Sequence, residues 1–266
     1  QALGCLSPSM KMVEMYYTAN GLPIDADITW SYSNRYKLAS ESSPVYEGVI
    51  PMNIDVVNLH LRREPRFYAC IAGDRMYWQR GTNTVDKDYN FLVKAHKGEE
   101  PWGTQYDFIV SNSWQNINGY WLKKHLFSWF NTLGYANNLQ GNETAAIIRL
   151  AEVYLMQAEA WNEYLDQPDS KVYDPLDKVR ERAGANPLTG SITVRDILDE
   201  RGRELCGEYC RFYDLKRTGM FKNSEYLENT HPDLAQFFHP NYALRPISTT
   251  FTATITNGSE YQNPGY

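Results

Sequence analysis

The chain has 266 residues, of which 42% are hydrophobic, so it can bury the core of one large or two ordinary domains and is not a disordered chain. Its formal net charge is −6, and no run of lysine and arginine forms a phosphate-binding stripe, which argues against a nucleic-acid partner. Aromatic residues make up 14% of the chain, and such rings either pack in a core or serve surfaces that bind planar or amphipathic ligands.

The first 48 residues predict one short helix followed by an aromatic segment. The helix is expected around residues 10–17, where Ser7, Pro8 and Ser9 provide a start signal, and a turn follows at residues 20–23. Polar and aromatic residues then alternate over residues 30–36. If these rings are exposed they form a stacking surface, and if they are buried they are ordinary packing. The sequence leaves both interpretations open.

A long irregular loop is predicted in the next part of the chain. Residues 62–69 read RREPRFYA and are followed by a β-like run that ends at Trp78. Residues 81–119 are rich in glycine, asparagine, aspartate and threonine and have no sustained period, which is typical of a loop. Long ordered loops in compact domains are usually functional. Aromatic residues lie in or beside this one: Trp102, Tyr106, Trp114, Tyr120 and Trp121.

A helical hairpin is the best-patterned part of the chain. Apolar residues recur at three- and four-residue steps over residues 144–165 and predict a helix there; these are Ile147, Leu150, Ala151, Tyr154, Leu155, Ala158 and Trp161. Because Pro168 cannot continue a helix, the first one ends before it. A second helix is expected to begin at Pro175, with Asp174 as N-cap, and to end at Gly184. Such a hairpin normally stacks on similar units.

Another helix is predicted after residue 193. Residues 193–196 read as an N-terminal cap, and Ile197, Leu198, Arg201 and Leu205 continue the helix. Gly202 and Gly207 are expected inside it, each at a cost of about 1 kcal/mol relative to alanine, which indicates close packing. Opposite charges three residues apart favour a structural network over a catalytic cluster; the pairs are Glu200/Arg203, Glu208/Arg211, Arg211/Asp214 and Asp214/Arg217.

Motifs of catalysis are absent from the sequence. There is no nucleophile elbow, P-loop or zinc-protease helix, so we expect no catalytic residue and no cofactor. The histidines lack ligand spacing, so no metal site is expected; they are His60, His96, His125, His231 and His239. The four cysteines, at positions 5, 70, 206 and 210, are expected to be free thiols. No apolar run approaches the roughly 20 residues of a membrane span.

Several phrases resemble the SusD/RagB family of outer-membrane nutrient-binding lipoproteins. These are RLAEVYLMQAEAWNE from Arg149, LDKVRERAG from Leu176 and ILDERGRELCGEYCRFYDLKR from Ile197, together with RREPRFYA, RPIS at 245–248 and the terminal QNPGY. They occur in the family's order over most of the chain. Tyr209, Ser248 and Asp177 depart from the family's usual residues at positions that concern local packing more than function.

The resemblance implies a mainly α, SusD-like fold of tetratricopeptide-like helical hairpins with long irregular loops and minor β structure. The chain would be the C-terminal portion of a family member, with residues 1–140 forming a loop-rich ligand-binding part, 141–220 a helical scaffold and 221–266 an extended tail. The first helix pairs and the lipidated cysteine of the family are expected outside this chain. Membrane contact would be made only through that lipid anchor.

The implied function is non-catalytic binding of oligosaccharides, or of peptides in some members, on the bacterial outer membrane. The protein would act as a lid on a SusC-like TonB-dependent transporter during nutrient uptake. Flat rings bury the apolar faces of sugars, so the expected ligand contacts are aromatic residues before the hairpin: Trp30, Tyr32, Tyr36, Trp78 and Trp102. The alternatives are a structural module that only docks the transporter and a glycoside hydrolase.

Overall fold

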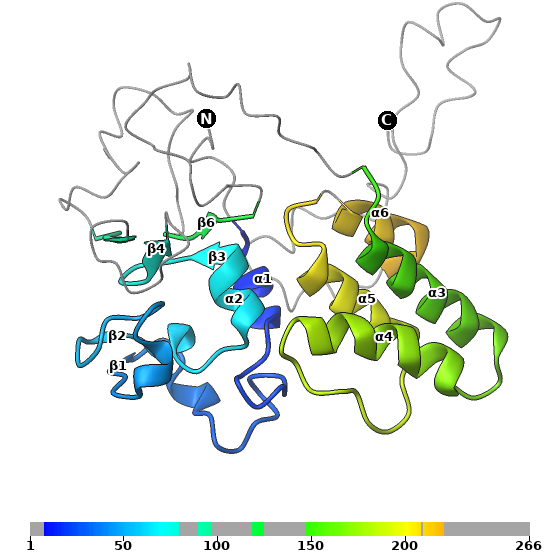
Figure 1. The fold of residues 1–266 in the computed structure, drawn as a ribbon, viewed down its shortest axis with the longest axis horizontal. Helices are drawn as coiled ribbons and strands as arrows, with labels where there is room; N and C mark the ends of the chain where they lie inside the picture. Colours follow the sequence, from blue (N-terminus) through cyan, green and yellow to red (C-terminus); the bar gives the residue numbers. More distant parts are fainter. Residues whose placement is uncertain (1–7, 80–89, 97–118, 125–146, 209, 221–266) are drawn as a thin grey trace, which may run out of the picture. The chain divides into compact units, whose positions relative to one another are not determined.

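The computed structural model describes residues 8–79, 90–96, 119–124, 147–208 and 210–220 (Figure 1). By their contacts these residues fall into two compact units, one ending at Glu208 and the other following it. Six α-helices and six strands of two or three residues lie in the described ranges, which confirms the mainly α fold with minor β structure. The division of the sequence at residues 140 and 220 stays a prediction.

Short elements separated by turns form the first part of the first unit. In chain order they are α1 (Met10–Met15), η1 (Tyr32–Asn34), β1 (Leu38–Ala39), η2 (Pro44–Tyr46), β2 (Val56–Val57), η3 (Asn58–His60), α2 (Pro65–Cys70), β3 (Ile71–Ala72), β4 (Tyr77–Gln79), β5 (Asn90–Leu92) and β6 (Trp121–Leu122). The strands pair antiparallel as β1 with β2, β3 with β6 and β4 with β5. The helix predicted near the start is confirmed, with the Ser9 hydroxyl accepting from Met12 N at 3.2 Å.

A buried arginine organises the core of this part. Arg63 is 1% exposed, and its guanidinium donates to carbonyl oxygens that include those of Val13 at 2.8 Å and Tyr16 at 2.6 Å. Both oxygens belong to the end of α1, where a helix leaves carbonyls without internal partners. Burial lowers the pKa of Arg63 to about 10, so the guanidinium stays charged at neutral pH. The RREPRFYA segment therefore closes a helix about 50 residues earlier in the chain.

Three helices pack together in the second part of the same unit. They are α3 (Leu150–Tyr164), α4 (Ser170–Arg182) and α5 (Val194–Glu204), drawn from green to yellow in Figure 1. Their shared core contains the fully buried Leu155, Leu176 and Ile197. The predicted hairpin is thus confirmed as α3 and α4, and α5 covers it.

Both starts of the hairpin helices differ from the prediction. Ile147 is 93% exposed and precedes the first helical residue, Leu150, so it does not belong to the packed face. The structure starts α4 at Ser170, capped by the Asp169 carboxylate, and places Pro175 inside the helix. Starting one turn earlier buries Val172 completely, and this packing outweighs the backbone hydrogen bond that a proline lacks.

The predicted end of α4 is confirmed by its hydrogen bonds. Gly184 has a φ of +71°, and its N–H donates to the carbonyl of Glu181. The next N–H, that of Ala185, reaches back to the carbonyl of Arg180 at 2.9 Å. Together these bonds form a Schellman motif, in which glycine is favoured because it has no Cβ.

Thr193 and Asp196 cap α5 as predicted. The Thr193 N–H donates to the Asp196 carboxylate at 2.8 Å, and the Asp196 N–H donates to the Thr193 hydroxyl. Gly202 lies inside α5 and is buried, but Gly207 lies beyond its end, contrary to the prediction. Its φ of +79° fits a turn that leaves the helix. The helix α6 (Cys210–Arg217) belongs to the second unit.

Candidate functional site

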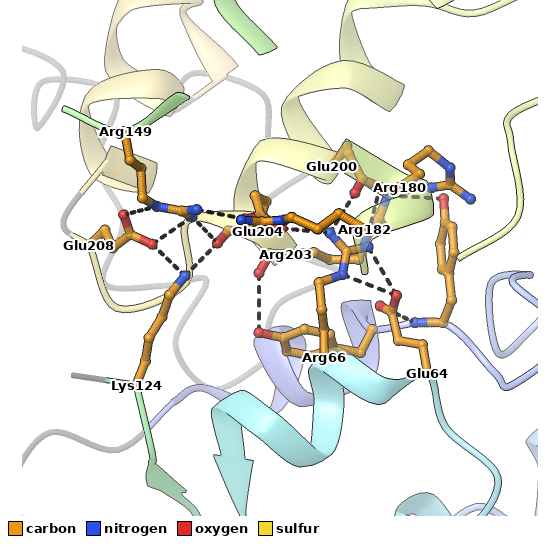
Figure 2. A network of polar contacts seen from close by, with 12 residues as sticks. Glu64, Arg66, Lys124, Arg149, Arg180, Arg182, Glu200, Arg203, Glu204 and Glu208 are labelled. Atoms are coloured by element: carbon orange, nitrogen blue, oxygen red, sulfur yellow. Dashed lines mark hydrogen bonds and ion pairs between the residues drawn. The ribbon is translucent and has the colours of Figure 1, made fainter. Parts of the chain in front are cut away.

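A buried network of arginines and glutamates joins α2 to the helical part (Figure 2). At its centre Glu200 is fully buried and accepts from Arg66 at 2.6 Å, Arg180 at 2.7 Å and Arg203 at 2.8 Å. Burial alone would raise the pKa of Glu200, but the three guanidinium groups outweigh it and hold the pKa well below its usual range. This carboxylate is therefore ionised and inaccessible.

The network continues on both sides of Glu200. Glu204 accepts from Arg66 at 3.2 Å and from Arg149 at 2.7 Å, and it also pairs with Arg182 (Figure 2). Further out, Glu208 pairs with Arg149 at 2.7 Å and with Lys124. Each of these acids faces cations at hydrogen-bond distance, so none is held ready to exchange a proton with a substrate.

The sequence predicted this cluster to be structural, and the contacts confirm the pairs Glu200/Arg203 and Asp214/Arg217, each at 2.8 Å. The partners contributed by Arg66 and Arg180 were not predicted, because they come from other helices. The pairs formed by Arg211 stay predictions.

Two of the five predicted ligand-binding rings lie together on the surface. Tyr32 is 37% exposed and Tyr36 is 57% exposed, and the guanidinium of Arg35 lies between them. Its Cζ is 4.0 Å from the centre of the Tyr32 ring and 4.4 Å from that of Tyr36, the geometry of cation–π contacts. These three residues form what we call the tyrosine clamp.

Glu14 of α1 fixes the tyrosine clamp in place. Its Oε1 accepts from Arg35 Nε at 2.8 Å and from the Tyr36 hydroxyl at 2.5 Å. Burial and the Glu14 charge raise the pKa of Tyr36, so its hydroxyl stays protonated and donates to Glu14. Arg35 was not predicted, although it stands between the two tyrosines in the sequence. No sequence pattern indicated Glu14, which is 21 residues from Arg35.

The other predicted rings do not join the tyrosine clamp. Trp30 is only 7% exposed, and its indole N–H donates to the carbonyl of Leu61 at 3.0 Å, so most of its ring is core packing. Trp78 is half-buried on β4, and Trp102 lies outside the described residues.

Tyr120 is buried, with its hydroxyl 2.9 Å from His60 Nε2. Burial lowers the pKa of His60 to about 3, so this imidazole is neutral.

In the part of the chain that the structure describes, no group of three or more histidine, cysteine, aspartate or glutamate side chains is arranged to hold a metal ion. Cys70, Cys206 and Cys210 are free thiols, as predicted, while Cys5 lies outside that part. Among the described helices, none combines the length and the apolar composition that a membrane crossing requires.

Comparison with known proteins assigns the family. The model of the SusD family matches residues 1–266, the whole chain. The chain belongs to the SusD family. The RREPRFYA and helix phrases that predicted this membership contribute to α2, α3, α4, α5 and α6, whereas RPIS and QNPGY lie outside the described residues.

Two curated relatives from the SusD family match parts of the chain. The SusD-like protein P25 of Formosa agariphila is 38% identical over 113 residues, which are 40% of this chain and 20% of that protein. The starch-binding protein SusD of Bacteroides thetaiotaomicron is 33% identical over 81 residues, or 30% of this chain and 14% of that protein. The matched regions thus span a fifth or less of these relatives.

Solved structures support the same fold. BT4246 superposes with a TM-score of 0.68 at 24% identity, over 98% of this chain and 44% of that one. A SusD-like protein of Bacteroides fragilis, BF3747, gives a TM-score of 0.51 at 21% identity, over 80% of this chain and 36% of that one. At this identity the likeness concerns the fold, and it confirms the SusD-like architecture.

Proposed function

We propose that this protein binds oligosaccharides at the bacterial cell surface without catalysing a reaction, and delivers them to a SusC-like TonB-dependent transporter of the outer membrane. The observation that carries the proposal is the tyrosine clamp, two exposed phenol rings held rigidly in a chain of the SusD family. The name of one relative, a starch-binding protein, supports a glycan as ligand.

The chemistry of the tyrosine clamp suits a sugar. The apolar C–H face of a pyranose ring can lie on an exposed phenol, and neighbouring polar groups can hydrogen-bond its hydroxyls. Because Glu14 and Arg35 already hold Tyr36 in position, little side-chain entropy is lost when a ligand binds. A peptide with aromatic or proline residues is the alternative ligand for the same surface.

Binding is favoured over hydrolysis by the state of the carboxylates. A glycosidase needs an acid whose pKa is raised toward the working pH. Among the described acids of the part before the hairpin, Asp27 is buried, with 4% exposure. Burial would raise its pKa, but hydrogen bonds from Thr18, Thr29 and Asn20 outweigh burial and lower the pKa to about 2. Asp27 is therefore a poor proton donor.

A purely structural role in docking the transporter is the second candidate. It is favoured by apolar side chains on one side of α3 that are exposed in the described part of the chain: Leu150 at 63%, Val153 at 42% and Met156 at 45%. If the transporter is captured equally well by a protein whose tyrosine clamp has been removed, and glycan uptake is also unchanged, this second role is favoured.

The test is a binding survey with a matched control. The protein is titrated calorimetrically with panels of plant, host and microbial oligosaccharides and of peptides, and then the double variant Tyr32→Ala, Tyr36→Ala is compared with Tyr164→Ala, which removes a ring 79% exposed on α3. We expect the double variant to bind its glycan about tenfold more weakly, equivalent to about 1.4 kcal/mol. The proposal fails if no glycan binds, or if the double variant binds as tightly as the control.

A further inference from the structure

A small hollow lies next to the segment that carries the tyrosine clamp. Its volume is about 200 Å³, and it is lined by Thr18, Ala19, Asn20, Asp27, Thr29, Trp30, Tyr46 and Arg62. The residues from Asp27 to Trp30 that line it directly precede Tyr32 in the chain. One short segment therefore contributes both to the hollow and to the clamp.

Hydrogen bonds build the walls of the hollow before any ligand is present. The turn at Thr18 is joined to the opposite wall by the Ala19 N–H, which donates to the carbonyl of Arg62 at 2.8 Å. Asp27, 4% exposed, accepts from the Thr18 hydroxyl at 2.6 Å and from the Thr29 hydroxyl at 2.7 Å. The Trp30 ring is fixed by its bond to Leu61.

Arg62 has an unusual backbone that directs it away from its neighbour. Its φ is +53°, in the left-handed region that residues other than glycine seldom adopt. Arg63 points into the core, whereas the side chain of Arg62 is 62% exposed and reaches the hollow. Strained backbone of this kind concentrates at functional sites, because the surrounding structure must stabilise it.

Three polar side chains at the hollow have atoms that can form hydrogen bonds with a ligand. Arg62 uses Nε to pair with the buried Glu41 at 3.0 Å, and its two terminal nitrogens have no partner among the described residues. The Tyr46 hydroxyl and Asn20 Oδ1 also form no hydrogen bond with any described residue. Both donors and acceptors are therefore available beside the Trp30 and Tyr46 rings.

The charge and size of the hollow select the ligand class. Asp27 and Glu41 supply two negative charges against the single positive charge of Arg62, which disfavours an anion. A cation is disfavoured because each Asp27 oxygen already accepts two hydrogen bonds. The hollow has a volume that corresponds to roughly six or seven water molecules at about 30 Å³ each. This volume is below the roughly 300 Å³ at which pockets for drug-sized ligands begin, so the hollow suits a small ligand.

We propose that this hollow is a binding site for a single neutral sugar unit, held by hydrogen bonds to Arg62, Asn20 and Tyr46 beside the mostly buried Trp30 ring. The proposal deepens the proposed function and rests on it, because it adds a place for one end of an oligosaccharide whose other units contact the clamp. The clamp supplies apolar area, and the hollow supplies the directional hydrogen bonds that distinguish one sugar from another.

The experiment monitors the Trp30 indole N–H by ¹⁵N NMR while single sugars are added to the full chain. The probes are glucose, galactose, mannose, fucose and N-acetylglucosamine, each up to millimolar concentration, with sodium phosphate and acetate as anions. We expect at least one sugar to shift the Trp30 signal, and the anions to leave it unchanged.

Variants of the lining residues identify the site. Arg62→Asn removes the guanidinium but tolerates the left-handed backbone, and Tyr46→Phe removes only a hydroxyl. Each should weaken the response to the sugar about tenfold. Arg182→Asn is the matched control, because Arg182 is 61% exposed and pairs with a buried glutamate, as Arg62 does with Glu41. Far-UV circular dichroism checks that each variant is folded.

The possible results separate the two proposals. The hollow is not a sugar site if no sugar shifts the Trp30 signal, if phosphate or acetate shifts it more than sugars do, or if Arg62→Asn and Tyr46→Phe respond like the wild type. Oligosaccharide binding that depends on the clamp would then still support the proposed function. Conversely, single sugars in the hollow with no oligosaccharide bound at the clamp would contradict the proposed function alone.

Discussion

Glu200 is the residue whose environment depends most on the rest of the first unit. Its two carboxylate oxygens face the guanidinium groups of three arginines from α2, α4 and α5, and none of these side chains has more than 9% exposure. Removing one member of a buried ion-pair network leaves the others charged and without partners in a low-dielectric environment. The acid therefore stabilises the fold mainly by neutralising cations that the fold has already buried.

We expect Glu200→Gln to lower the free energy of unfolding by about 3 to 5 kcal/mol, because the amide keeps the shape but not the charge. Urea denaturation at neutral pH measures the loss, and Glu163→Gln, an exposed site on α3, serves as the control. A loss within about 0.5 kcal/mol, as for ordinary surface substitutions, would mean that the arginines find other partners.

The same variant gives a pH dependence with a definite sign. Because the folded state lowers the pKa of Glu200, its contribution is fully present above the ordinary glutamate pKa of about 4.3 and is lost as the pH falls through the folded-state value. The stability difference between wild type and variant should be constant near neutral pH and decrease in acid.

Single residues also show where sequence reasoning reached its limit. Tyr32 and Tyr36 were predicted as ligand contacts from residue type alone, but the sequence left their exposure open. Trp30 in the same segment is buried in the core, with its indole N–H donating to Leu61. What makes the two tyrosines a pair is Glu14, which acts through a tertiary contact. Periodicity and spacing carry no information on such contacts.

At the scale of elements, helices with local signals were predictable and those that depend on packing were not. The capping box at Thr193 and the glycine after α4 depend only on residues close to them in the sequence, and both were predicted at the correct positions. The start of α4 was misplaced at Pro175, because proline favours a first turn and only the burial of Val172 against α3 extends the helix backwards.

The end of α4 offers a test of how much one glycine contributes. Gly184 has a left-handed φ of +71°. A Cβ atom added at this position would lie 3.1 Å from Cγ of Pro65, in α2. At Gly190 the φ is +84°, but nothing lies within 4 Å. The two sites therefore share the backbone strain and differ in the contact.

We expect Gly190→Ala to cost about 1 to 2 kcal/mol from strain alone, and Gly184→Ala to cost a further 1 to 3 kcal/mol or so from overpacking against Pro65. Thermal and urea unfolding measure both variants. Equal losses at the two glycines would show that α2 moves aside freely and that the contact with Pro65 does not constrain the packing.

At the scale of the whole molecule, the first unit depends on contacts between residues far apart in the sequence. Arg66 in α2 pairs with Glu200, 134 residues later, and with Glu204, 138 residues later (Figure 2). The sequence predicted the local pair Glu200/Arg203 but not these pairs, since opposite charges at such separations occur in any chain. The loop-rich part that carries the tyrosine clamp is thus attached to the helical scaffold through an arginine of the RREPRFYA phrase.

Arg66→Met should uncouple these two parts of the first unit. The variant keeps a long side chain but leaves Glu64, Glu200 and Glu204 without that guanidinium, so contacts between α2 and α5 weaken while the packing of α3 on α4 is untouched. Native-state hydrogen exchange read by mass spectrometry reports the opening of α2 and α5 separately. In the wild type we expect both helices to exchange with one opening free energy, and in the variant α2 should exchange faster than α5.

Arg182→Met is the control, because Arg182 also pairs with Glu204 but belongs to the scaffold itself. If both helices lose protection equally in Arg66→Met, the network contributes stability without coupling the part that carries the tyrosine clamp to the helical part.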